Sequence, residues 1–227
     1  MVASIVIKAN IDIGELPGIH YTNDLVVTFV QRSGAMDGKL KVGDKILTVN
    51  DQPVDDRCSF ERIIRRHHIH RSKVNLCVYS CGPLPRFTIV RDPARGEQIM
   101  HEQQVPADKN IARREGFIYL MLTIEQRKST NRLGLMVKNG EPGSVYVSRV
   151  SYGSLSAEKL QVGDRILELD GVVISDKEAA KKAFIKGLTS STASVSVIVE
   201  RPDSALARGI VADALVPGSP HSERHKK

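Results

Sequence analysis

The sequence predicts a mainly β fold with helices, arranged as two copies of one small domain. Residues 38–51 return as residues 158–171, and seven of the nine positions from Lys39 to Leu47 are identical in the two copies. Several short runs alternate apolar and polar residues, as half-buried strands do, and each repeated stretch precedes a segment with helical spacing of apolar residues. Each copy is therefore expected to be a partly open β-sandwich or barrel of about five to six strands and two helices.

The second copy gives a complete series of elements. Gly163 suits the positive φ that a corner before a strand requires, and Asp164 can accept hydrogen bonds from the amides of this turn. Ser175 and Glu178 have the spacing of a capping box, which predicts a helix that ends at Gly187. The remaining expected elements are strands at 116–125, 145–150 and 195–199 and a short helical turn at 154–160.

The first copy repeats this order. Asp55 or Asp56 is expected to cap a helix whose buried face carries Phe60, Ile63 and Ile64. The other expected elements are strands at 4–8, 25–30 and 74–78 and a helical turn at 34–40.

These elements predict how the chain is divided. The expected parts are a first copy at 1–80, a linker at 81–114, a second copy at 115–202 and a tail at 203–227. Within the linker, Phe87-Thr88-Ile89-Val90 could add a strand. The linker either tethers the copies flexibly or packs between them, and the sequence leaves both open. The tail is expected to be disordered except for a helix near residues 204–215.

The order of these features resembles the PDZ domain family. A strand is followed by an apolar-Gly-apolar loop, two strands, a short helix, the stretch Leu-x-Val-Gly-Asp-x-Ile-Leu, a longer helix and a final strand. The resemblance covers both copies and implies a tandem pair of PDZ domains. PDZ domains bind the C-terminal tail of a partner as an added strand at an open sheet edge, and backbone amides of the loop hold the terminal carboxylate.

In the second copy, the resemblance places the carboxylate loop at Leu133-Gly134-Leu135. Gly134 lets the backbone approach the ligand, and Leu133 and Leu135 would line the pocket for its last side chain. Phe184, on the longer helix, would form the floor of that pocket. The edge strand that pairs with the ligand would be Met136, Val137 and Lys138.

The first residue of the longer helix usually sets the preference of a PDZ domain for the third-from-last ligand side chain, and it is most often His. Here it is Lys177 in the second copy and Arg57 in the first, with Lys181 and Glu61 one turn later. A cation favours an acidic ligand residue, although an exposed ion pair contributes only about 0–1 kcal/mol. The stem of Lys181 can line the pocket while its ammonium group reaches water.

The first copy departs from the family pattern in its loop. The preferred match is Pro17-Gly18-Ile19, in which Pro17 has no N–H, so one amide of the carboxylate site is missing. The strict 120-residue offset instead selects Ile13-Gly14-Glu15. Both alternatives predict a weaker first groove, so we expect a degenerate or structural first domain and a second domain that binds peptide.

Composition and motifs argue against several other functions. The net charge of +7 is spread along the chain, so nucleic-acid binding is not expected. The longest apolar run is far shorter than the ~20 residues of a membrane span. The three cysteines form neither a C-x-x-C pair nor an even set, which fits a reducing cytoplasm. No nucleophile turn, phosphate loop or metal-ligand spacing occurs, so no catalytic residue, metal or cofactor is expected.

The basic cluster from Arg65 to Arg71 favours a different function. It could bind phosphoinositide headgroups or another anionic membrane surface, or it could be the solvated C-terminal end of a helix, where cations suit the helix dipole. The main hypothesis is a non-catalytic cytoplasmic adaptor that binds the C-terminal tails of other proteins, mainly through the second domain. It would meet membranes through its partners, or weakly through this cluster.

Overall fold

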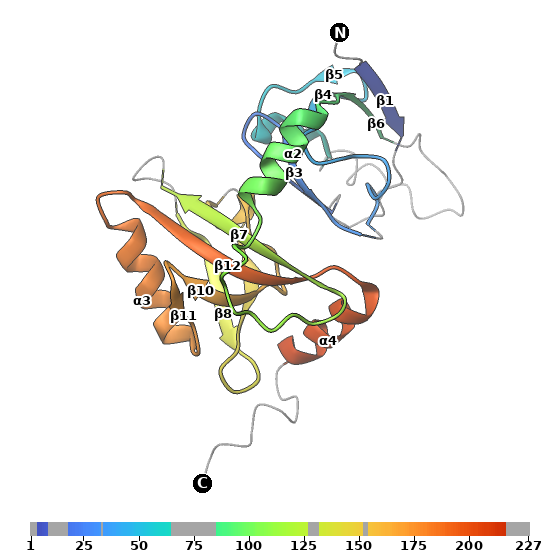
Figure 1. Ribbon diagram of the computed structural model, residues 1–227. Helices are drawn as coiled ribbons and strands as arrows, with labels where there is room; N and C mark the ends of the chain where they lie inside the picture. The colour runs from blue at the N-terminus through green and yellow to red at the C-terminus, as the bar shows by residue number, and fades with distance from the viewer. Residues whose placement is uncertain are drawn as a thin grey trace, which may run out of the picture. The chain divides into compact units, whose positions relative to one another are not determined.

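The chain divides between Glu102 and Gln103 into two units, Met1–Glu102 and Gln103–Lys227 (Figure 1). The computed structural model describes residues 4–8, 18–32, 34–64, 85–126, 132–151 and 154–216. Both units combine antiparallel strands with helices, as the sequence predicts. The basic cluster from Arg65 to Arg71 lies outside the described residues.

The second unit is built on one antiparallel sheet with strand order β7-β12-β10-β9-β8, and the short β11 also pairs with β10. The register of β7 and β12 runs without a shift from Phe117 opposite Pro202 to Glu125 opposite Ser194. The strands are β7 (Phe117–Glu125), β8 (Leu135–Asn139), β9 (Val145–Val150), β10 (Arg165–Leu169), β11 (Val172–Val173) and β12 (Ser194–Pro202).

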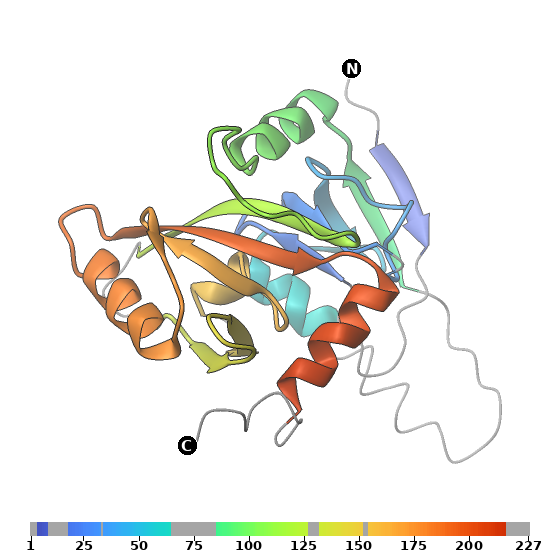
Figure 2. The same ribbon diagram turned by 60° about the horizontal axis from the view of Figure 1, so that its bottom comes forward.

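Three helical segments complete the described part of this unit. The 3-10 helix η1 (Ser156–Glu158) is the expected helical turn, and α3 (Lys177–Leu188) and α4 (Ala205–Leu215) lie at opposite ends of β12 (Figures 1 and 2). α3 is capped by Asp176, whose carboxylate accepts hydrogen bonds from two amides of the first turn at 2.9 and 2.8 Å. The expected capping box at Ser175 is therefore wrong, because the next residue occupies the cap.

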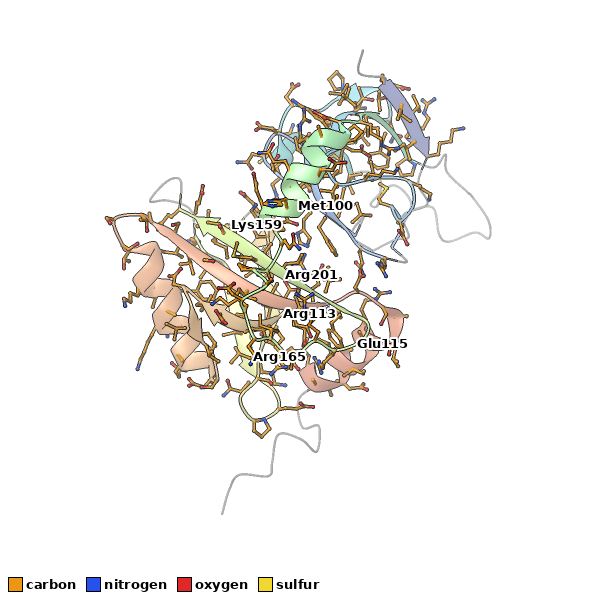
Figure 3. All side chains as sticks on the ribbon, viewed as in Figure 1. Met100, Arg113, Glu115, Lys159, Arg165 and Arg201 are labelled. Atoms are coloured by element: carbon orange, nitrogen blue, oxygen red, sulfur yellow. The ribbon has the colours of Figure 1, made fainter. Side chains whose placement is uncertain are left out.

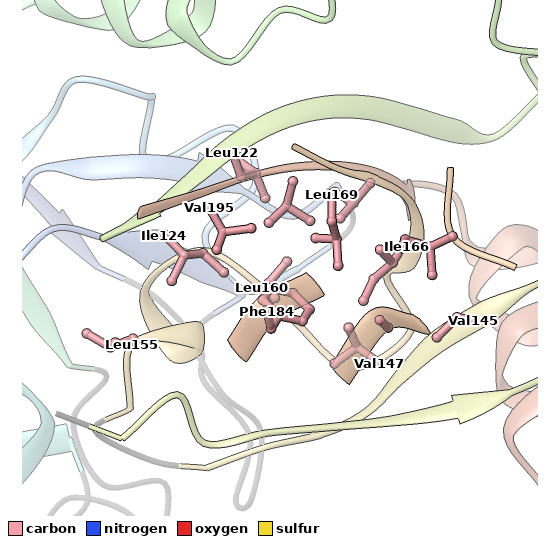
Figure 4. Packing of buried hydrophobic residues seen from close by; sticks show 14 residues of the cluster. Leu122, Ile124, Val145, Val147, Leu155, Leu160, Ile166, Leu169, Phe184 and Val195 are labelled. Carbon is pink, nitrogen blue, oxygen red and sulfur yellow. The ribbon is translucent and has the colours of Figure 1, made fainter. Parts of the chain in front are cut away.

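The core of the second unit lies between its sheet and α3. Figure 4 shows Phe184 of α3 beside Leu160, and Phe184 is 3% exposed. The rest of the cluster is aliphatic: Leu122, Ile124, Val145, Val147, Leu155, Leu160, Ile166, Leu169, Ile174, Ala180, Val195, Val197 and Val199. Burial of each large apolar side chain stabilises the unit by about 1.5–3 kcal/mol.

Residues 103–116 cover the other face of this sheet. Val105 packs with Tyr119 and Ile198 in a second small cluster. The carboxylate of Glu200, 1% exposed, accepts hydrogen bonds from the Tyr119 hydroxyl at 2.5 Å and from the Arg114 guanidinium. Burial, followed by the hydrogen bond to Glu200, raises the pKa of Tyr119. These contacts make the segment part of the second unit.

The first unit has a four-stranded antiparallel sheet of order β1-β6-β4-β5 and a separate pair β2-β3, which an isolated bridge between Val26 and Lys45 links to β4. Residues 57–64 are helical and are capped by Asp56, whose carboxylate accepts the Ser59 N–H at 2.7 Å. Hydrogen bonds from Ser59 lower the pKa of Asp56. The strands are β1 (Ser4–Lys8), β2 (Ile19–Tyr21), β3 (Val27–Val30), β4 (Lys45–Val49), β5 (Gln52–Pro53) and β6 (Arg86–Val90).

The closing strand of the first unit lies in the segment expected to be a linker. β6 pairs with both β1 and β4, the position expected for residues 74–78, which lie outside the described residues. It is followed by α2 (Pro93–Glu102). Where the segment expected to be a linker is described, residues 85–102 fall in the first unit and residues 103–114 in the second. In the expected tail, α4 is the helix anticipated near residues 204–215, and residues 217–227 lie outside the described residues.

A buried corner repeats in the two units. In the second, the carboxylate of Asp164 accepts the N–H of Gln161 at 3.0 Å; in the first, Asp44 accepts the N–H of Lys41 at 2.8 Å. Both aspartates are fully buried. The corner role that the sequence predicts for this aspartate is therefore confirmed.

Each corner also contains an arginine that sequence reasoning missed. Arg201 donates two hydrogen bonds to Asp164, at 2.8 and 2.7 Å, and Arg91 donates two to Asp44, at 2.9 and 2.8 Å. Arg201 also donates a hydrogen bond to the backbone carbonyl of Lys159 at 2.8 Å, and Figure 3 labels both residues. Two-pronged pairs of this kind fix geometry as well as charge. The shared pair supports a common architecture for the two units.

The glycine of each corner is covered by the helix that follows the closing strand. Gly43 has a φ of +90°, and a Cβ there would lie 2.4 Å from the backbone nitrogen of Gly96 in α2. Gly163 has a φ of +96°, and its Cβ would lie 3.1 Å from Val211 in α4. α2 and α4 therefore pack on the corners of their own units.

Candidate functional site

The two outer strands of the second unit's sheet differ in what lies beside them. Along β7, the N–H of Met121 donates to the carbonyl of Gln103 at 2.9 Å, and Gln104 bridges Leu120. On the other side, β8 pairs with β9 and, among the described residues, with no further strand. β8 is therefore the open edge of this sheet.

The hydrogen-bond alternation of β8 shows which backbone groups face that open edge. The N–H of Ser151 donates to the carbonyl of Gly134 at 2.7 Å, and the next pair in register is Leu135 opposite Val150. Bonded and non-bonded pairs alternate in an antiparallel ladder, so the N–H and C=O of Leu135 point away from β9. The same alternation, beyond a register shift, directs the backbone of Val137 outward.

The carbonyls of residues 132–134, at the loop before β8, are fixed by the backbone N–H groups of Leu155, Ser156 and Ser151. The carbonyl of Arg132 accepts the N–H of Leu155 at 3.1 Å, and that of Leu133 accepts the N–H of Ser156 at 3.1 Å. The carbonyl of Gly134 is held by Ser151, as described above. Because a trans peptide directs C=O and N–H to opposite sides, the N–H groups of residues 133–135 point away from η1.

These three N–H groups form a set of donors at the end of the open edge. Within the described residues, neither Leu133 nor Gly134 uses its N–H in a hydrogen bond, and the ladder turns the N–H of Leu135 outward. Convergent backbone donors of this kind bind anions without a charged side chain. The loop can therefore accept a carboxylate.

Gly134 is required at this loop. Its φ is +64°, and a Cβ there would lie 2.2 Å from the Cβ of Ser154, which is closer than two non-bonded carbon atoms can approach. Any other residue would have to move the loop from the η1 segment that fixes its carbonyls.

α3 lies beside β8. The region between them, referred to below as the cleft, is the expected peptide site. Leu133, Leu135 and Val137 are half-buried and pack on the core that contains Phe184, as does Ala183 of α3. The side chain of Asn139, at the end of β8, accepts the N–H of Lys177 at 2.7 Å. Strand and helix are therefore held together at one end of an apolar cleft.

The charged side chains around this cleft differ in their contacts. Lys177 and Lys181 are exposed on α3. Lys138 donates instead to the carbonyls of Leu215 and Val216 at the end of α4, at 3.2 and 3.4 Å. Met136 is 57% exposed on the same face of β8 as Lys138. Of the expected edge-strand side chains, only that of Val137 is directed to the cleft.

Comparison with known proteins identifies this fold. The model of the PDZ domain family matches residues 122–200, which contain the loop, β8, the corner and α3. Residues 122–200 are a PDZ domain. The family model matches no described strand of the first unit, so the expected second PDZ domain remains a proposal.

Curated proteins are also similar in sequence to parts of this chain. The human "PDZ domain-containing protein 4" is 27% identical over 196 residues, which cover 81% of this chain and 23% of that protein. The mouse "Disks large homolog 5" is 30% identical over 73 residues, or 32% of this chain and 4% of that protein. The chain thus spans less than a quarter of the length of these relatives.

Two solved structures from choanoflagellates are similar to part of the chain. A PDZ domain from GIPC bound to GAIP peptide has 16% identity and a TM-score of 0.32, and it covers 39% of this chain and 95% of its own. Dlg1 PDZ2 of Monosiga brevicollis has 19% identity and a TM-score of 0.29, and it covers 36% of this chain and 96% of its own.

The first unit has a counterpart of the PDZ loop at Gly18. Its φ is +66°, and its carbonyl accepts the N–H of Gln31 at 2.8 Å, as that of Gly134 accepts the N–H of Ser151. Ile19 then pairs with Val30, and the register shifts two residues later, as it does in the PDZ domain after Met136. Gly18 therefore occupies the position of Gly134. This geometry favours the loop Pro17-Gly18-Ile19 over Ile13-Gly14-Glu15; Pro17 and residues 13–15 lie outside the described residues.

In the first unit, the corresponding region between β2 and the helix at residues 57–64 holds contacts among its own side chains. By the same register, Tyr21 stands where the PDZ domain has Val137, and it is 7% exposed. Its hydroxyl donates to Glu61 at 3.1 Å, and the guanidinium of Arg57 lies 4.9 Å from its ring centre. Arg57 and Glu61, with side chains 14% and 11% exposed, form an ion pair at 2.9 Å.

The expected binding residues on the longer helix therefore differ in their contacts between the two units. Lys177 and Arg57 are both the first helical residues, as predicted. The lysines stay exposed, whereas Arg57 and Glu61 contact Tyr21. Sequence reasoning missed Tyr21, although an aromatic residue at a position that holds valine in the other copy was a visible signal.

Among the described residues, no group of three or more His, Cys, Asp or Glu side chains could hold a metal ion. Within the same part of the chain, no helix has the length and apolar character needed to cross a membrane.

Proposed function

We propose that this protein is a non-catalytic cytoplasmic adaptor that binds the C-terminal tails of other proteins, mainly through the PDZ domain at residues 122–200. The bound tail would pair with β8 as an added strand, with its last side chain over Leu133, Leu135 and Phe184. Main-chain hydrogen bonds would supply affinity, and the cleft would supply specificity.

One observation carries this proposal: the N–H groups of residues 133–135 are held outward at the end of an open strand. A free carboxylate accepts such bonds at both oxygens, whereas an internal peptide carbonyl carries no charge to match them. A chain end is therefore the ligand that suits the loop and the strand edge together.

The exposed cations on α3 support a preference within this ligand class. Lys177 and Lys181 lie on the helix that faces β8. A tail that runs along β8 would place its third-from-last side chain near the start of α3, where an acidic residue would pair with these lysines. The contribution is modest, about 0–1 kcal/mol for an exposed pair, so it would tune affinity without deciding whether binding occurs.

The first unit is proposed to be a second, PDZ-like copy that does not serve as the main binding site. The shared corner, the shared position of Gly18 and Gly134, and the equivalent strand pairing support a common fold. The alignment with the human relative covers 81% of the chain, more than either unit holds, so it includes residues of both. Tyr21, Arg57 and Glu61 fill the cleft that a ligand would need.

A library of peptides with free C-termini, screened against the full chain, tests the proposal. We expect selected peptides to share an apolar last residue, and Gly134→Leu to abolish their binding. Gly143→Ala is the matched control, because Gly143 also has a positive φ, +75°, but has open space around it. Peptide binding that survives Gly134→Leu would contradict the proposal.

The alternative at Arg65–Arg71 predicts a different result in a second assay. An adaptor of the proposed kind should sediment equally with phosphatidylcholine vesicles that contain or lack phosphatidylserine or a phosphoinositide. Strong sedimentation with anionic vesicles, removed by Arg65→Gln and Arg66→Gln, would favour membrane binding through the cluster.

A further inference from the structure

The serine hydroxyls beside the carboxylate loop have no part in the function proposed so far. Ser156 is fully buried and Ser154 is 7% exposed, both in the segment that begins η1. Buried hydroxyls are retained where they make hydrogen bonds, because an unpaired one costs about 1–3 kcal/mol. The partners of these two hydroxyls therefore show what they do.

The hydroxyl of Ser156 donates to the carbonyl of Leu133 at 2.6 Å. The same carbonyl also accepts the backbone N–H of Ser156 at 3.1 Å, so one residue holds it twice. The Leu133 carbonyl and the Gly134 N–H share one peptide plane and point in opposite directions. Two bonds to the carbonyl consequently fix the direction of the central donor of the loop.

Ser154 supports this arrangement from the side. Its hydroxyl donates to the carbonyl of Ser151 at 2.6 Å and lies 3.1 Å from the hydroxyl of Ser156. The N–H of Ser151 in turn holds the carbonyl of Gly134, which shares its peptide plane with the N–H of Leu135. The Ser156 hydroxyl thus holds the carbonyl that shares a peptide plane with the Gly134 N–H. The Ser154 hydroxyl holds Ser151, the residue that binds the carbonyl in the same plane as the Leu135 N–H.

The first unit lacks these hydroxyls at the corresponding positions. The offset of 120 that relates the corners places Gly34 and Met36 opposite Ser154 and Ser156. Met36 is fully buried and belongs to the apolar core. At these two positions, the side-chain hold on the loop is therefore present in the PDZ domain and has no counterpart in the first unit.

We propose that Ser156, supported by Ser154, is a positioning residue that gives the PDZ domain its preference for a free terminal carboxylate over an uncharged chain end. This proposal rests on the proposed function, since it concerns the same loop and the same ligand. The hydroxyl does not touch the ligand. It acts by keeping the Gly134 N–H directed at the carboxylate before binding, so that no free energy is lost in ordering the loop.

The test compares two forms of one peptide on the full chain. The strongest peptide from the free-C-terminus library is made as the free acid and as the C-terminal amide, and the ratio of the two Kd values is measured by calorimetry or fluorescence anisotropy. We expect the unmodified protein to prefer the acid strongly and Ser156→Ala to reduce this ratio by about three- to tenfold, the range of one or two hydrogen bonds. A variant that merely loosened the fold would weaken both peptides alike and leave the ratio unchanged.

Ser148→Ala is the matched control. The Ser148 hydroxyl also donates to a carbonyl of β8, that of Met136 at 3.2 Å, but outside the loop. Its removal should leave the acid-to-amide ratio unchanged. Ser156→Cys, which keeps the side-chain volume and weakens the donor, replaces Ser156→Ala if the alanine variant does not unfold cooperatively.

The outcomes separate the two proposals. If the unmodified protein binds no library peptide, or binds acid and amide equally, the proposed function fails and this inference fails with it. If the unmodified protein prefers the acid while Ser156→Ala and Ser156→Cys keep the full preference, the proposed function stands and the role of Ser156 is wrong.

Discussion

At the position that holds Val137 in the second unit, the first unit has Tyr21, and the consequences reach across the cleft. Tyr21 donates to Glu61 and lies under Arg57, while the corresponding helix residues of the second unit, Lys177 and Lys181, are exposed. Both units share the glycine loop and the same register shift beside it. Beside these shared features, the two units differ in which side chains contact one another: Tyr21, Arg57 and Glu61 do so in the first unit, whereas Lys177 and Lys181 are exposed in the second.

The corners of the two units also differ in how exposed their arginine side chains are. Arg201 is 1% exposed beside Asp164, whereas Arg91 is 27% exposed beside Asp44. A buried charge that loses its partner cannot recover its hydration, but a partly exposed one can. The same ion pair should therefore matter more to the second unit than to the first.

The largest expected effect is on stability, and it tests the difference between the two corners. Asp164→Ala should destabilise the second unit by about 3–5 kcal/mol, because it leaves Arg201 buried without a counter-charge. Asp44→Ala should cost the first unit about 2 kcal/mol, because Arg91 can turn to water. Hydrogen exchange measured separately over β10 with β12 and over β4 with β6 reports the two costs. Equal losses of protection would contradict the role of burial.

A reciprocal exchange of the three cleft residues tests the first comparison. The background is Gly134→Leu, which is expected to abolish peptide binding by the PDZ domain. In this background, the triple variant Tyr21→Val, Arg57→Lys, Glu61→Lys should raise the peptide affinity of the first unit by about tenfold or more, measured by fluorescence anisotropy. The physical reason is that the change removes a ring and an ion pair from the cleft while the loop at Gly18 stays in place.

The opposite exchange is the control for this prediction. Val137→Tyr with Lys177→Arg and Lys181→Glu should reduce binding by the PDZ domain by a similar factor and leave its unfolding transition cooperative. If the first unit gains no affinity although the second loses its own, the missing N–H of Pro17 limits the first unit more than its filled cleft does.

The smallest expected effect concerns charge alone. Lys177→Glu should weaken peptides with an acidic third-from-last residue by up to about fivefold, and the loss should shrink as salt is added, because exposed pairs are screened. Peptides with a neutral residue there should bind as before. Lys186→Gln, an exposed lysine in the last turn of the same helix, is the comparison variant. If Lys177→Glu lowers the affinity for all peptides equally, charge pairing is excluded as the cause.

Elements that depend on neighbouring residues were predictable from the sequence. The corner glycines have positive φ and the corner aspartates accept the amides of their turns, as expected. Asn50-Asp51 and Asp170-Gly171, which are residue types typical of tight turns, also have positive φ at both residues. Such features follow from turn chemistry over a few residues, which a sequence displays directly.

Elements that depend on distant residues were missed or misplaced. Arg91 and Arg201 stand 47 and 37 residues from the aspartates they pair with. β6 closes the first unit from within the segment expected to be a linker, and residues 103–116 cover the sheet of the second. Several short apolar runs in the sequence have the pattern of a strand, so the local pattern did not show which of them closes the sheet.

The sequence by itself determined that one stretch of residues returns at an offset of 120, that an apolar-Gly-apolar loop precedes the expected edge strand of the second copy, and that this copy resembles a PDZ domain. The tertiary structure decided which backbone donors of that loop point outward and which side chains contact one another beside it. It did so because the partners of an N–H group or a side chain often come from segments that are far apart along the chain.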